Sequence, residues 1–478
     1  MSETADDRRA KLQRLQEAGI EPFPHAFPGV VPIADIRDAH DGIEAGDELP
    51  DATYRIAGRI VQRRGMGGAT FVDLVDRSGK IQLHAKRDDL GDESFDTLTS
   101  LDLGDLIGVD GFVFKSRRGE LSVRVTNWQL LAKSLRPPPD KFHGLEDVET
   151  RYRHRELDLI ANAEARELFI MRSKVVSATR NWLDARGFLE VETPVLQRLY
   201  GGALARPFVT HFNELDRDFY LRIADELYLK RLIVGGLERV YEIGKDFRNE
   251  GFSRKHQPEF TMLEWYQAYA DYNDIADELE ELVESLSHLA TDQSIDWSRP
   301  WKRISLRDAI FDETGVDISE ARDKDALLAA AREKEIALDP NENWPKLVDS
   351  LLSKFVEPKL MNPTLLMDYP VELSPFAKRH RSKEGLVERF EGFAGGMEFT
   401  NAFSELNDPD DQRARFEDQV KDREGGDQET QPYDEDYVFA LEHGMPPTGG
   451  IGIGIDRLVM LLSGRDSIRE VQLFPAMR

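Results

Sequence analysis

The chain has 478 residues, with 63 Lys and Arg against 90 Asp and Glu, and a formal net charge of −27. This acidity argues against a protein that coats nucleic acid without sequence preference. The absence of cysteine excludes disulfides, thiolate metal ligands and a thiol nucleophile, and no stretch approaches the ~18 apolar residues of a membrane helix. We therefore expect a globular, cytoplasmic protein of about three domains with no membrane segment.

Three organisational segments are predicted before residue 150. Residues 1–50 are expected to form an amphipathic helix, with Leu12 and Leu15 at helical spacing, followed by an acidic connector. Residues 51–135 contain short alternating runs separated by Gly or Ser turns, a pattern typical of a small antiparallel barrel of roughly five or six strands. Residues 136–150 begin with a Pro-rich stretch and are predicted to be a linker.

The remaining residues, 151–478, predict an α+β domain. A long helix is expected from Glu164 to Arg186, followed by one strand with the sequence FLEVETPVL. Later strands carry polar residues at alternate positions and are joined by hairpins, which favours an antiparallel sheet flanked by helices. An acidic stretch at 274–360 is expected to be a helical insertion at the periphery.

The run FRNEGFSRKHQPEFTMLEWYQAY concentrates acids, cations and aromatic residues. As two strands, it places Arg248 and Glu250 on one face of the first, and Phe260, Glu264 and Tyr266 on one face of the second. An acid between two aromatic residues implies a buried cationic partner or a ligand. The alternative is a structural Arg/Glu pair inside a core.

The segment VERFEGFAGGMEFTNAFSEL predicts a hairpin that brings Glu391 and Glu398 toward each other. Mg²⁺ bound by carboxylates and substrate phosphates would satisfy such a pair, although a solvent-facing acidic hairpin would also explain it. Asn401, Phe403 and Glu405 share one strand face, and Glu398 can join that face only if a bulge or bend intervenes.

The segment GGIGIGIDRLVMLLSG predicts a glycine-rich strand followed directly by a helix. Its G-x-G-x-G spacing differs from the dinucleotide fingerprint. The glycines indicate close approach by a ligand or by another part of the chain. Arg457 at the junction is well placed to meet a phosphate.

Together these motifs resemble those of the class II aminoacyl-tRNA synthetases. FLEVETP is similar to the first motif of that class, FRNEG to EFTMLEWYQAY to the second, and GIGIDRL to the third. Within the class, GGALARPF, ADELYLKRLIVGG, FTNAFSELNDPDDQ and SIREVQLFPAMR resemble the bacterial lysine-specific enzymes. The resemblance covers almost the whole chain.

The resemblance implies a ligase that activates L-lysine with ATP, releases pyrophosphate, and transfers lysine to the 3′ end of its tRNA. Arg248 and Arg457 would be catalytic, and the residues implied at ATP are Arg248, Glu250, His256, Phe260 and Arg457. Those implied at lysine are Gly202, Glu226, Glu264, Tyr266, Asn401, Phe403 and Glu405. Glu391 and Glu398 would hold Mg²⁺, with about two or three ions per subunit. Independently of the family, two carboxylates and a phenol oxygen suit a buried ammonium.

The barrel then resembles the OB-fold anticodon-binding domain of this group. Phe71 would stack on an anticodon base while Arg59, Gln82 and Glu120 read base edges, although Phe71 could instead belong to the barrel core. The resemblance also implies a homodimer, formed through the helix and strand between Arg166 and Pro194.

Two alternatives have different sequence signatures. A lysine ligase that modifies a protein would share the catalytic motifs but lack the N-terminal barrel. A catalytically inactive RNA-binding paralogue would have lost Arg248, Glu398 or Arg457, and all three are present.

Overall fold

The computed structural model describes residues 4–139, 145, 147–424 and 431–477. The chain divides into two compact units, Met1–Arg166 and Glu167–Arg478. Part of the predicted linker at 136–150 lies outside the described residues. None of the helices in the described part of the chain has the length and apolar content needed to span a bilayer.

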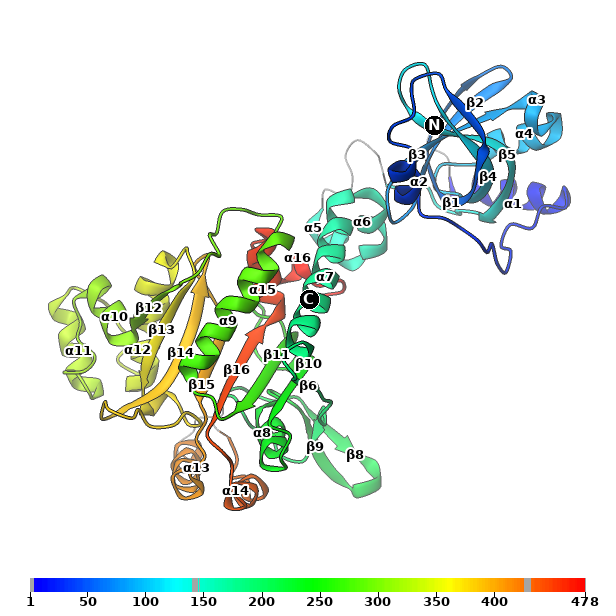
Figure 1. Ribbon diagram of the computed structural model, residues 1–478. Coiled ribbons are helices and arrows are strands. Elements are labelled where there is room, and N and C mark those ends of the chain that lie inside the picture. Colours follow the sequence, from blue (N-terminus) through cyan, green and yellow to red (C-terminus); the bar gives the residue numbers. More distant parts are fainter. Residues whose placement is uncertain (1–3, 140–144, 146, 425–430, 478) are drawn as a thin grey trace. The chain divides into compact units, whose positions relative to one another are not determined.

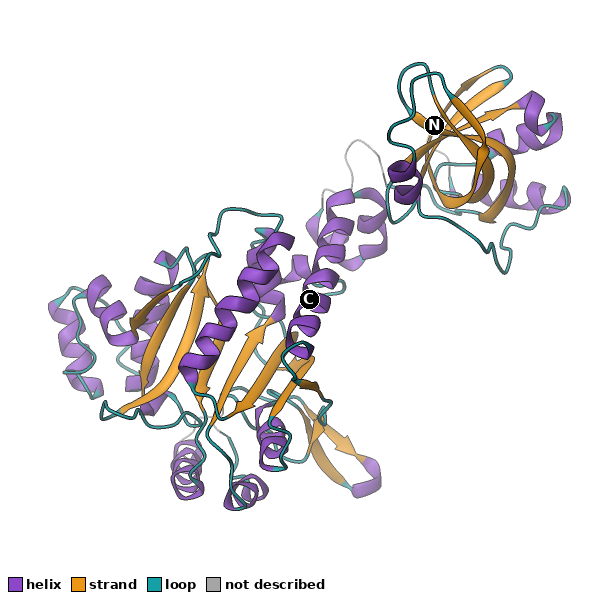
Figure 2. Ribbon diagram, viewed as in Figure 1, coloured by secondary structure: helices purple, strands orange, loops and turns teal. Residues whose placement is uncertain are grey.

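The first unit is built around a closed five-stranded barrel, as predicted (Figures 1 and 2). The strand order is β1-β2-β3-β5-β4, and β3 pairs with β5 in parallel while the other pairs are antiparallel. The strands are β1 (Glu48–Met66), β2 (Ala69–Val75), β3 (Lys80–Lys86), β4 (Leu106–Lys115) and β5 (Leu121–Ala132). Alternate residues such as Val72, Leu74, Ile81 and Leu83 fill the interior, because successive side chains of a strand point to opposite faces.

Short helices surround the barrel. Thr4 caps α1 through a capping box, and Leu15 of that helix is buried with the barrel core. The helices of this unit are α1 (Ala5–Glu17), α2 (Ile33–Ala39), α3 (Arg87–Leu90), α4 (Asp92–Ser100), α5 (Val148–Arg153) and α6 (Arg155–Ala161).

The second unit contains an eight-stranded sheet in the order β12-β13-β14-β15-β16-β11-β10-β6. The six strands from β13 to β10 are mutually antiparallel, as predicted, and the two edge pairs are parallel. The bounds are β6 (Leu189–Glu190), β10 (Arg239–Phe247), β11 (Glu259–Ala268), β12 (Lys302–Ser305), β13 (Thr364–Pro370), β14 (Leu386–Ala394), β15 (Met397–Ser404) and β16 (Thr448–Gly454).

The expectation of one strand over FLEVETPVL is wrong. Only β6 and β7 (Leu196–Gln197) are strands there, and β7 belongs to a separate sheet with β8 (Val209–Phe212) and β9 (Arg217–Leu221). Pro194 has no N–H for a ladder, and the N–H of Thr193 donates to the Glu242 carboxylate at 3.1 Å instead of to a neighbouring strand.

Helices cover both faces of the large sheet. Figure 1 shows α9 and α15 lying across one face, where they share a core with α7. The helices are α7 (Ala163–Asp184), α8 (Glu226–Val234), α9 (Tyr272–Leu286), α10 (Leu306–Thr314), α11 (Lys324–Glu333), α12 (Trp344–Leu351), α13 (Pro409–Glu424), α14 (Glu435–Glu442), α15 (Ile455–Ser463) and α16 (Ile468–Val471). Five short helical turns, η1 (Asn213–Leu215), η2 (Ser287–Leu289), η3 (Leu352–Val356), η4 (Glu357–Lys359) and η5 (Val371–Leu373), complete the unit.

The expectation of a peripheral helical insertion at 274–360 is wrong for the first helix of that stretch, α9. Ile275, Leu279 and Val283 of α9 are fully buried in the central core. The acidic residues of this amphipathic helix occupy mainly its other side, so composition alone concealed its apolar face. The later helices α10, α11 and α12 have a cluster of their own against β13 and β14.

Replacing Leu279 with Ala tests this placement. The change removes a side chain with no exposed surface, so we expect the free energy of unfolding of the second unit to fall by about 2–5 kcal/mol. Leu237→Ala is the control, because Leu237 is exposed and its loss should cost about 0.5 kcal/mol or less. Equal denaturant midpoints for the two variants would contradict the assignment of α9 to the core.

Candidate active site

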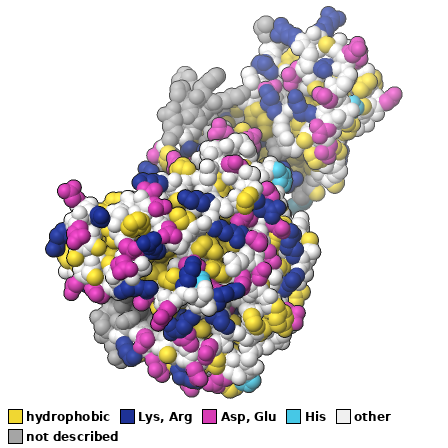
Figure 3. Space-filling model, turned by 60° about the vertical axis from the view of Figure 1, so that its left-hand side comes forward, with side chains coloured by type: hydrophobic (Ala, Val, Ile, Leu, Met, Phe, Trp, Pro, Cys, Tyr) yellow, Lys and Arg dark blue, Asp and Glu magenta, His cyan; other side chains and the backbone are white. Residues whose placement is uncertain are grey.

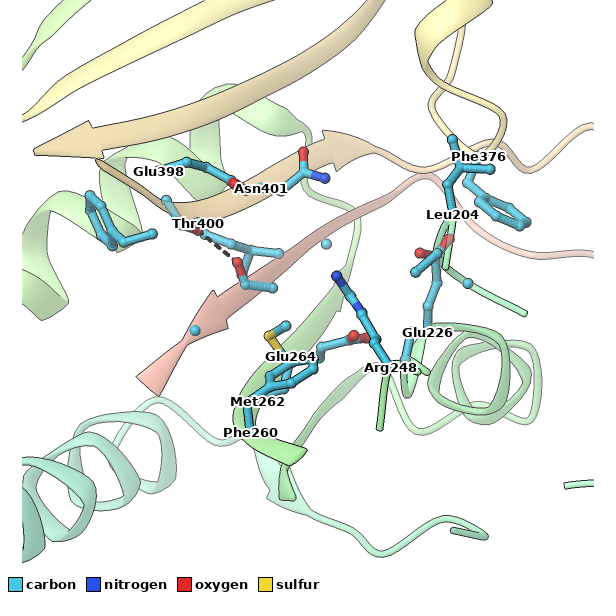
Figure 4. Close-up of a pocket in the computed structure, with 18 of the residues that line it drawn as sticks. Leu204, Glu226, Arg248, Phe260, Met262, Glu264, Phe376, Glu398, Thr400 and Asn401 are labelled. Carbon is cyan, nitrogen blue, oxygen red and sulfur yellow. Dashed lines mark hydrogen bonds between the residues drawn. The ribbon is translucent and has the colours of Figure 1, made fainter. Parts of the chain in front are cut away.

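A cavity of about 400 Å³ lies on the sheet face opposite α9. Leu263 and Trp265 of β11 point into the α9 core, so the alternate residues of this strand face the cavity. Figure 4 shows Phe260 and Glu264 reaching it from β11, and Glu398 and Asn401 from β15. The predicted residues that line it are Gly202, Glu226, Arg248, Glu250, His256, Phe260, Glu264, Tyr266, Glu398, Asn401, Phe403, Glu405 and Arg457. Glu391 is not among the lining residues.

A β-bulge brings Glu398 to the same face as the rest of β15. Glu391 pairs with Asn401, but the register then shifts and Phe393 pairs with Glu398, which leaves Phe399 as the extra residue. Paired residues share a face, so Glu398 and Asn401 both face the cavity while Phe399 joins the α9 core. The bulge that strand parity required is therefore present.

Arg248 lies in the loop after β10, so the prediction that it and Glu250 occupy a strand is wrong. The N–H of Glu250 donates back to the Arg248 carbonyl at 2.9 Å, which turns the chain away from the ladder. The Arg248 guanidinium lies 5.1 Å from the centroid of the Phe260 ring. This cation–π contact places a positive charge beside an aromatic face in the cavity.

Arg457 joins two distant segments at the other end of the cavity. Its Nη1 donates to both the carbonyl and the carboxylate of Glu398 at 2.9 Å, and its Nη2 lies 3.0 Å from Nε2 of His256. Burial and the neighbouring Arg457 lower the pKa of His256. The neutral ring accepts from Arg457 at Nε2 while Nδ1 lies 2.7 Å from the Ser253 hydroxyl.

Glu391 lies within a polar cluster beside the cavity. It accepts hydrogen bonds from Arg389 at 2.5 Å and from the Tyr369 hydroxyl at 2.8 Å. Burial raises the pKa of Glu391 to about 7 despite Arg389, and the Glu398 charge adds to the rise. Arg389, which sequence reasoning missed, also donates to Asn401 at 3.0 Å and so orients that amide. Within the described residues, no group of three acidic or histidine side chains could by itself hold a metal ion.

Glu264 is the buried acid singled out by its two aromatic neighbours. It accepts a hydrogen bond from the Tyr266 hydroxyl at 3.0 Å and from the Asp225 N–H at 3.3 Å, and neither donor is a cation. Burial, with the nearby charges of Asp246 and Glu226, raises the pKa of Glu264 to about 8. A ligand ammonium is the partner that would favour its ionised form.

Glu226 and Glu405 already share a cation within the protein. Lys230, one turn along α8, lies 2.5 Å from Glu226 and also forms an ion pair with Glu405. Sequence reasoning missed this lysine, although the i,i+4 spacing in ELYLK is an ion-pair signal.

Two glycines lie at the end of the cavity lined by Glu226 and Glu405. A Cβ on Gly450 would lie 2.0 Å from the Glu405 carboxylate and 2.4 Å from the Tyr266 ring, so only glycine fits there. Gly202 has a φ of +89° and donates its N–H to the side-chain oxygen of Gln431 at 2.8 Å. Gln431 also lines the cavity.

The four barrel residues named above occupy different surroundings. Phe71 lies on the outer side of β2, outside the core, and stacks on His84 with 4.4 Å between ring centroids. Gln82 is on the neighbouring strand and accepts from Ser122 at 3.2 Å, while Glu120 is exposed. Arg59 is half-buried and donates to the Gly104 carbonyl at 2.7 Å.

Comparison with protein families matches the two parts of the chain separately. Residues 147–478 match the family described as "tRNA synthetases class II (D, K and N)", and residues 54–131 match "OB-fold nucleic acid binding domain". The chain belongs to the class II tRNA synthetases. The eight-stranded sheet is thus part of the class II synthetase domain, and the barrel is the OB-fold domain.

Individual members of the family align over the full chain. The lysine–tRNA ligase of Dehalococcoides mccartyi is 51% identical over 478 residues, which covers 98% of this chain and 96% of that protein. The lysine–tRNA ligase of Carboxydothermus hydrogenoformans is 50% identical, with 100% and 98% covered. That of Staphylococcus epidermidis is 48% identical, with both chains covered completely.

The raised pKa of Glu264 predicts a stability penalty that the variant Glu264→Gln removes. Between its ordinary pKa and about 8, the folded protein holds a proton that the unfolded chain has lost, so stability falls as pH rises through this window. The glutamine cannot ionise. We expect the variant to melt several degrees above the unmodified protein at about pH 8 and close to it at about pH 5.

Glu259→Gln is the matched control, because Glu259 is an exposed glutamate on the same strand. It should shift the melting temperature little at either pH. A difference between Glu264→Gln and the unmodified protein that does not change with pH would contradict the assignment.

Proposed function

We propose that the protein is a lysine–tRNA ligase: it joins L-lysine and ATP to form lysyl-adenylate and pyrophosphate, then transfers lysine to the 3′-terminal ribose of its tRNA. The specificity for lysine rests on Glu264. This carboxyl is buried in the cavity, and both groups that donate hydrogen bonds to it are neutral. The side-chain ammonium of lysine supplies the missing positive charge. Aspartate in that position would place two carboxyl groups together.

ATP occupies the end of the cavity that contains Arg248 and Arg457. Adenine stacks on Phe260, with Glu250 and His256 at the mouth. Arg248 holds the lysine carboxylate against the α-phosphate, and Arg457 meets the γ-phosphate while His256 fixes its orientation. The attack needs no covalent enzyme intermediate or general base, since positioning and charge stabilisation provide the catalysis.

Lysine occupies the other end. Gly202 and Glu226 bind its α-ammonium, and Asn401, oriented by Arg389, binds its carboxylate. The ring of Phe403 packs on the aliphatic stem. Glu264, Tyr266 and Glu405 surround the side-chain ammonium.

The hairpin of β14 and β15 carries the two carboxyl residues that would hold Mg²⁺. Burial and the charge of Glu398 raise the pKa of Glu391, and a bound cation would favour its ionised form. Burial, with Glu398 and Glu357, likewise raises the pKa of Asp349. Glu391 and Glu398 would hold the ions together with phosphate oxygens, and the ions would neutralise the charge of the leaving pyrophosphate.

The tRNA would contact both units. In the barrel, at residues 51–135, Phe71 supplies a stacking surface and Gln82, Glu120 and Arg59 read base edges. Figure 3 shows Lys and Arg side chains gathered around a histidine on one face of the larger unit, which gives an acidic chain a local surface for phosphates. Residues 136–150 would be the linker and residues 151–478 the catalytic domain, but α5 and α6 at the start of that range belong to the first compact unit. The protein would act in the cytoplasm.

A homodimer accounts for exposed apolar side chains around the small sheet. Leu189 of β6, Leu196 of β7 and Val209 of β8 are each more than half exposed, at 51%, 53% and 58%. Phe212 at the end of β8 and Leu215 beyond it add to this surface. A second copy would cover it and exclude water from these side chains.

Pyrophosphate exchange tests the activation step. ATP, labelled pyrophosphate and each amino acid in turn are incubated with the protein. We expect lysine to stimulate the exchange, because lysine, unlike aspartate and asparagine, has a side-chain ammonium that can pair with Glu264. Stimulation by aspartate or asparagine would refute the specificity. Arg457→Ala is the negative control, because removing its charge should cost on the order of 3 kcal/mol in the transition state.

Gln82→Ala tests the role of the barrel. We expect kcat/KM for tRNA charging to fall on the order of 10-fold, since a base-edge contact is lost, while lysine-dependent pyrophosphate exchange does not change. Gln129→Ala, at an exposed position on β5, is the matched control. Equal charging by the two variants would remove Gln82 from the tRNA contact.

A further inference from the structure

Lys230 is a completely buried lysine behind the amino-acid end of the cavity. Its side chain has 0% exposure, and it is not one of the residues that line the cavity. Three aromatic rings surround its ammonium, with centroids 5.2–5.9 Å from Nζ; they belong to Phe376, Phe403 and Tyr266. An ammonium is kept in such a place only when charges of opposite sign offset its loss of water.

Two acids provide that offset. Glu226 and Glu405 both form ion pairs with Lys230, from α8 and from the residue after β15. Burial alone would lower the pKa of Lys230, but these two carboxylates reverse the effect and raise it, so the ammonium keeps its proton. Burial raises the pKa of Glu405, and Lys230 opposes that rise.

The charges at this end of the cavity match a diamino acid. Glu226, Glu264 and Glu405 are three carboxyls, and Lys230 is one ammonium, which leaves two negative charges when all four groups are ionised. Lysine brings two ammonium groups there, and its carboxylate faces Arg248 and Asn401. The occupied pocket is then neutral, the condition under which buried charges cost least.

We propose that Lys230 is a positioning residue: its buried ammonium holds Glu226 and Glu405 in place and sets the pocket charge to that required by an amino acid with two ammonium groups. This inference rests on the proposed function, because it takes lysine as the substrate. Lys230 acts through the two glutamates and does not itself touch the substrate.

Four other charged or titratable groups lie near this cluster. They come from each element packed around Lys230: Glu264 and Tyr266 on β11, Tyr437 on α14, and Arg389 on β14, which acts on Glu226. Tyr437 and Tyr266 remain neutral because burial raises the pKa of each phenol further. Lys230 is thus the cation that pairs with Glu226 and Glu405 within the described part of the chain.

Lys230→Met tests the role directly, because methionine keeps the length and removes the charge. We expect KM for lysine in pyrophosphate exchange to rise on the order of 10²-fold at about pH 7, with KM for ATP unchanged. One of the two glutamates then retains a proton until lysine binds. Calorimetry in buffers of different ionisation enthalpy should therefore show one more proton released per lysine than in the unmodified protein.

Lys133→Met is the matched control for removing a buried lysine. Lys133 in the barrel is equally buried and pairs with Asp102 and Asp105, so its loss also removes an ion-paired buried cation. Pyrophosphate exchange does not involve the barrel, and lysine KM and proton release should remain unchanged. Unchanged lysine KM and proton release in Lys230→Met would overturn the inference.

A double variant covers the case in which Lys230→Met does not fold. Glu405→Gln alone lowers the negative charge of the pocket by one and should raise the lysine KM. Adding Lys230→Met removes one positive charge and so restores the original net charge of the pocket, so the double variant should have a lower lysine KM than Glu405→Gln. A higher KM in the double variant would overturn the charge-setting role.

Exchange by the unmodified protein tests the substrate, and the Lys230 variants test the role of Lys230. If lysine does not stimulate exchange in the unmodified protein, the proposed function is wrong and this inference falls with it. If lysine stimulates exchange but the lysine KM of the Lys230 variants does not change in the directions given above, only the inference is wrong.

Discussion

The second unit must keep several acids uncharged or paired on one buried face of a sheet. Two fully buried cations do most of this. Arg222 lies within 3.2 Å of Asp225, Glu242 and Asp246, and Lys230 pairs with Glu226 and Glu405. Glu264 is left with neutral donors in the described part of the chain. Burying an unpaired carboxylate costs several kcal/mol. The positions of these two cations therefore decide which buried carboxyl a positively charged ligand group would stabilise.

This constraint separates the two ends of the cavity chemically. At the end with Arg248 and Arg457, the protein presents positive charge, and the acids Glu398 and Glu391 are held by Arg457 and Arg389. At the other end it presents excess negative charge. A ligand pair with phosphates at one end and ammonium groups at the other satisfies both, which is the charge distribution of ATP beside a diamino acid.

Much of this arrangement could be predicted from the sequence. Strand periodicity placed Phe260, Glu264 and Tyr266 on one face, and the glycine-rich strand before Arg457 was recognised correctly. Other features depend on contacts between distant residues. The single-residue bulge at Phe399 leaves no composition signal, and the acidic character of α9 concealed its buried apolar side. The contacts of Lys230 with Glu405 and of Arg389 with Asn401 join separate segments, so local spacing gives no signal for them.

The bulge at Phe399 also separates two parts of β15. Glu398 lies before it and pairs with Arg457; Asn401 and Phe403 lie after it, and Asn401 accepts from Arg389. The extra residue changes which side chains face inward without breaking the ladder to β16, where Thr400 to Ser404 remain in continuous register. β15 therefore presents Glu398 and Asn401 on one face although an unbroken strand would place them on opposite faces, so one inserted residue brings two separately held polar side chains into the same cavity.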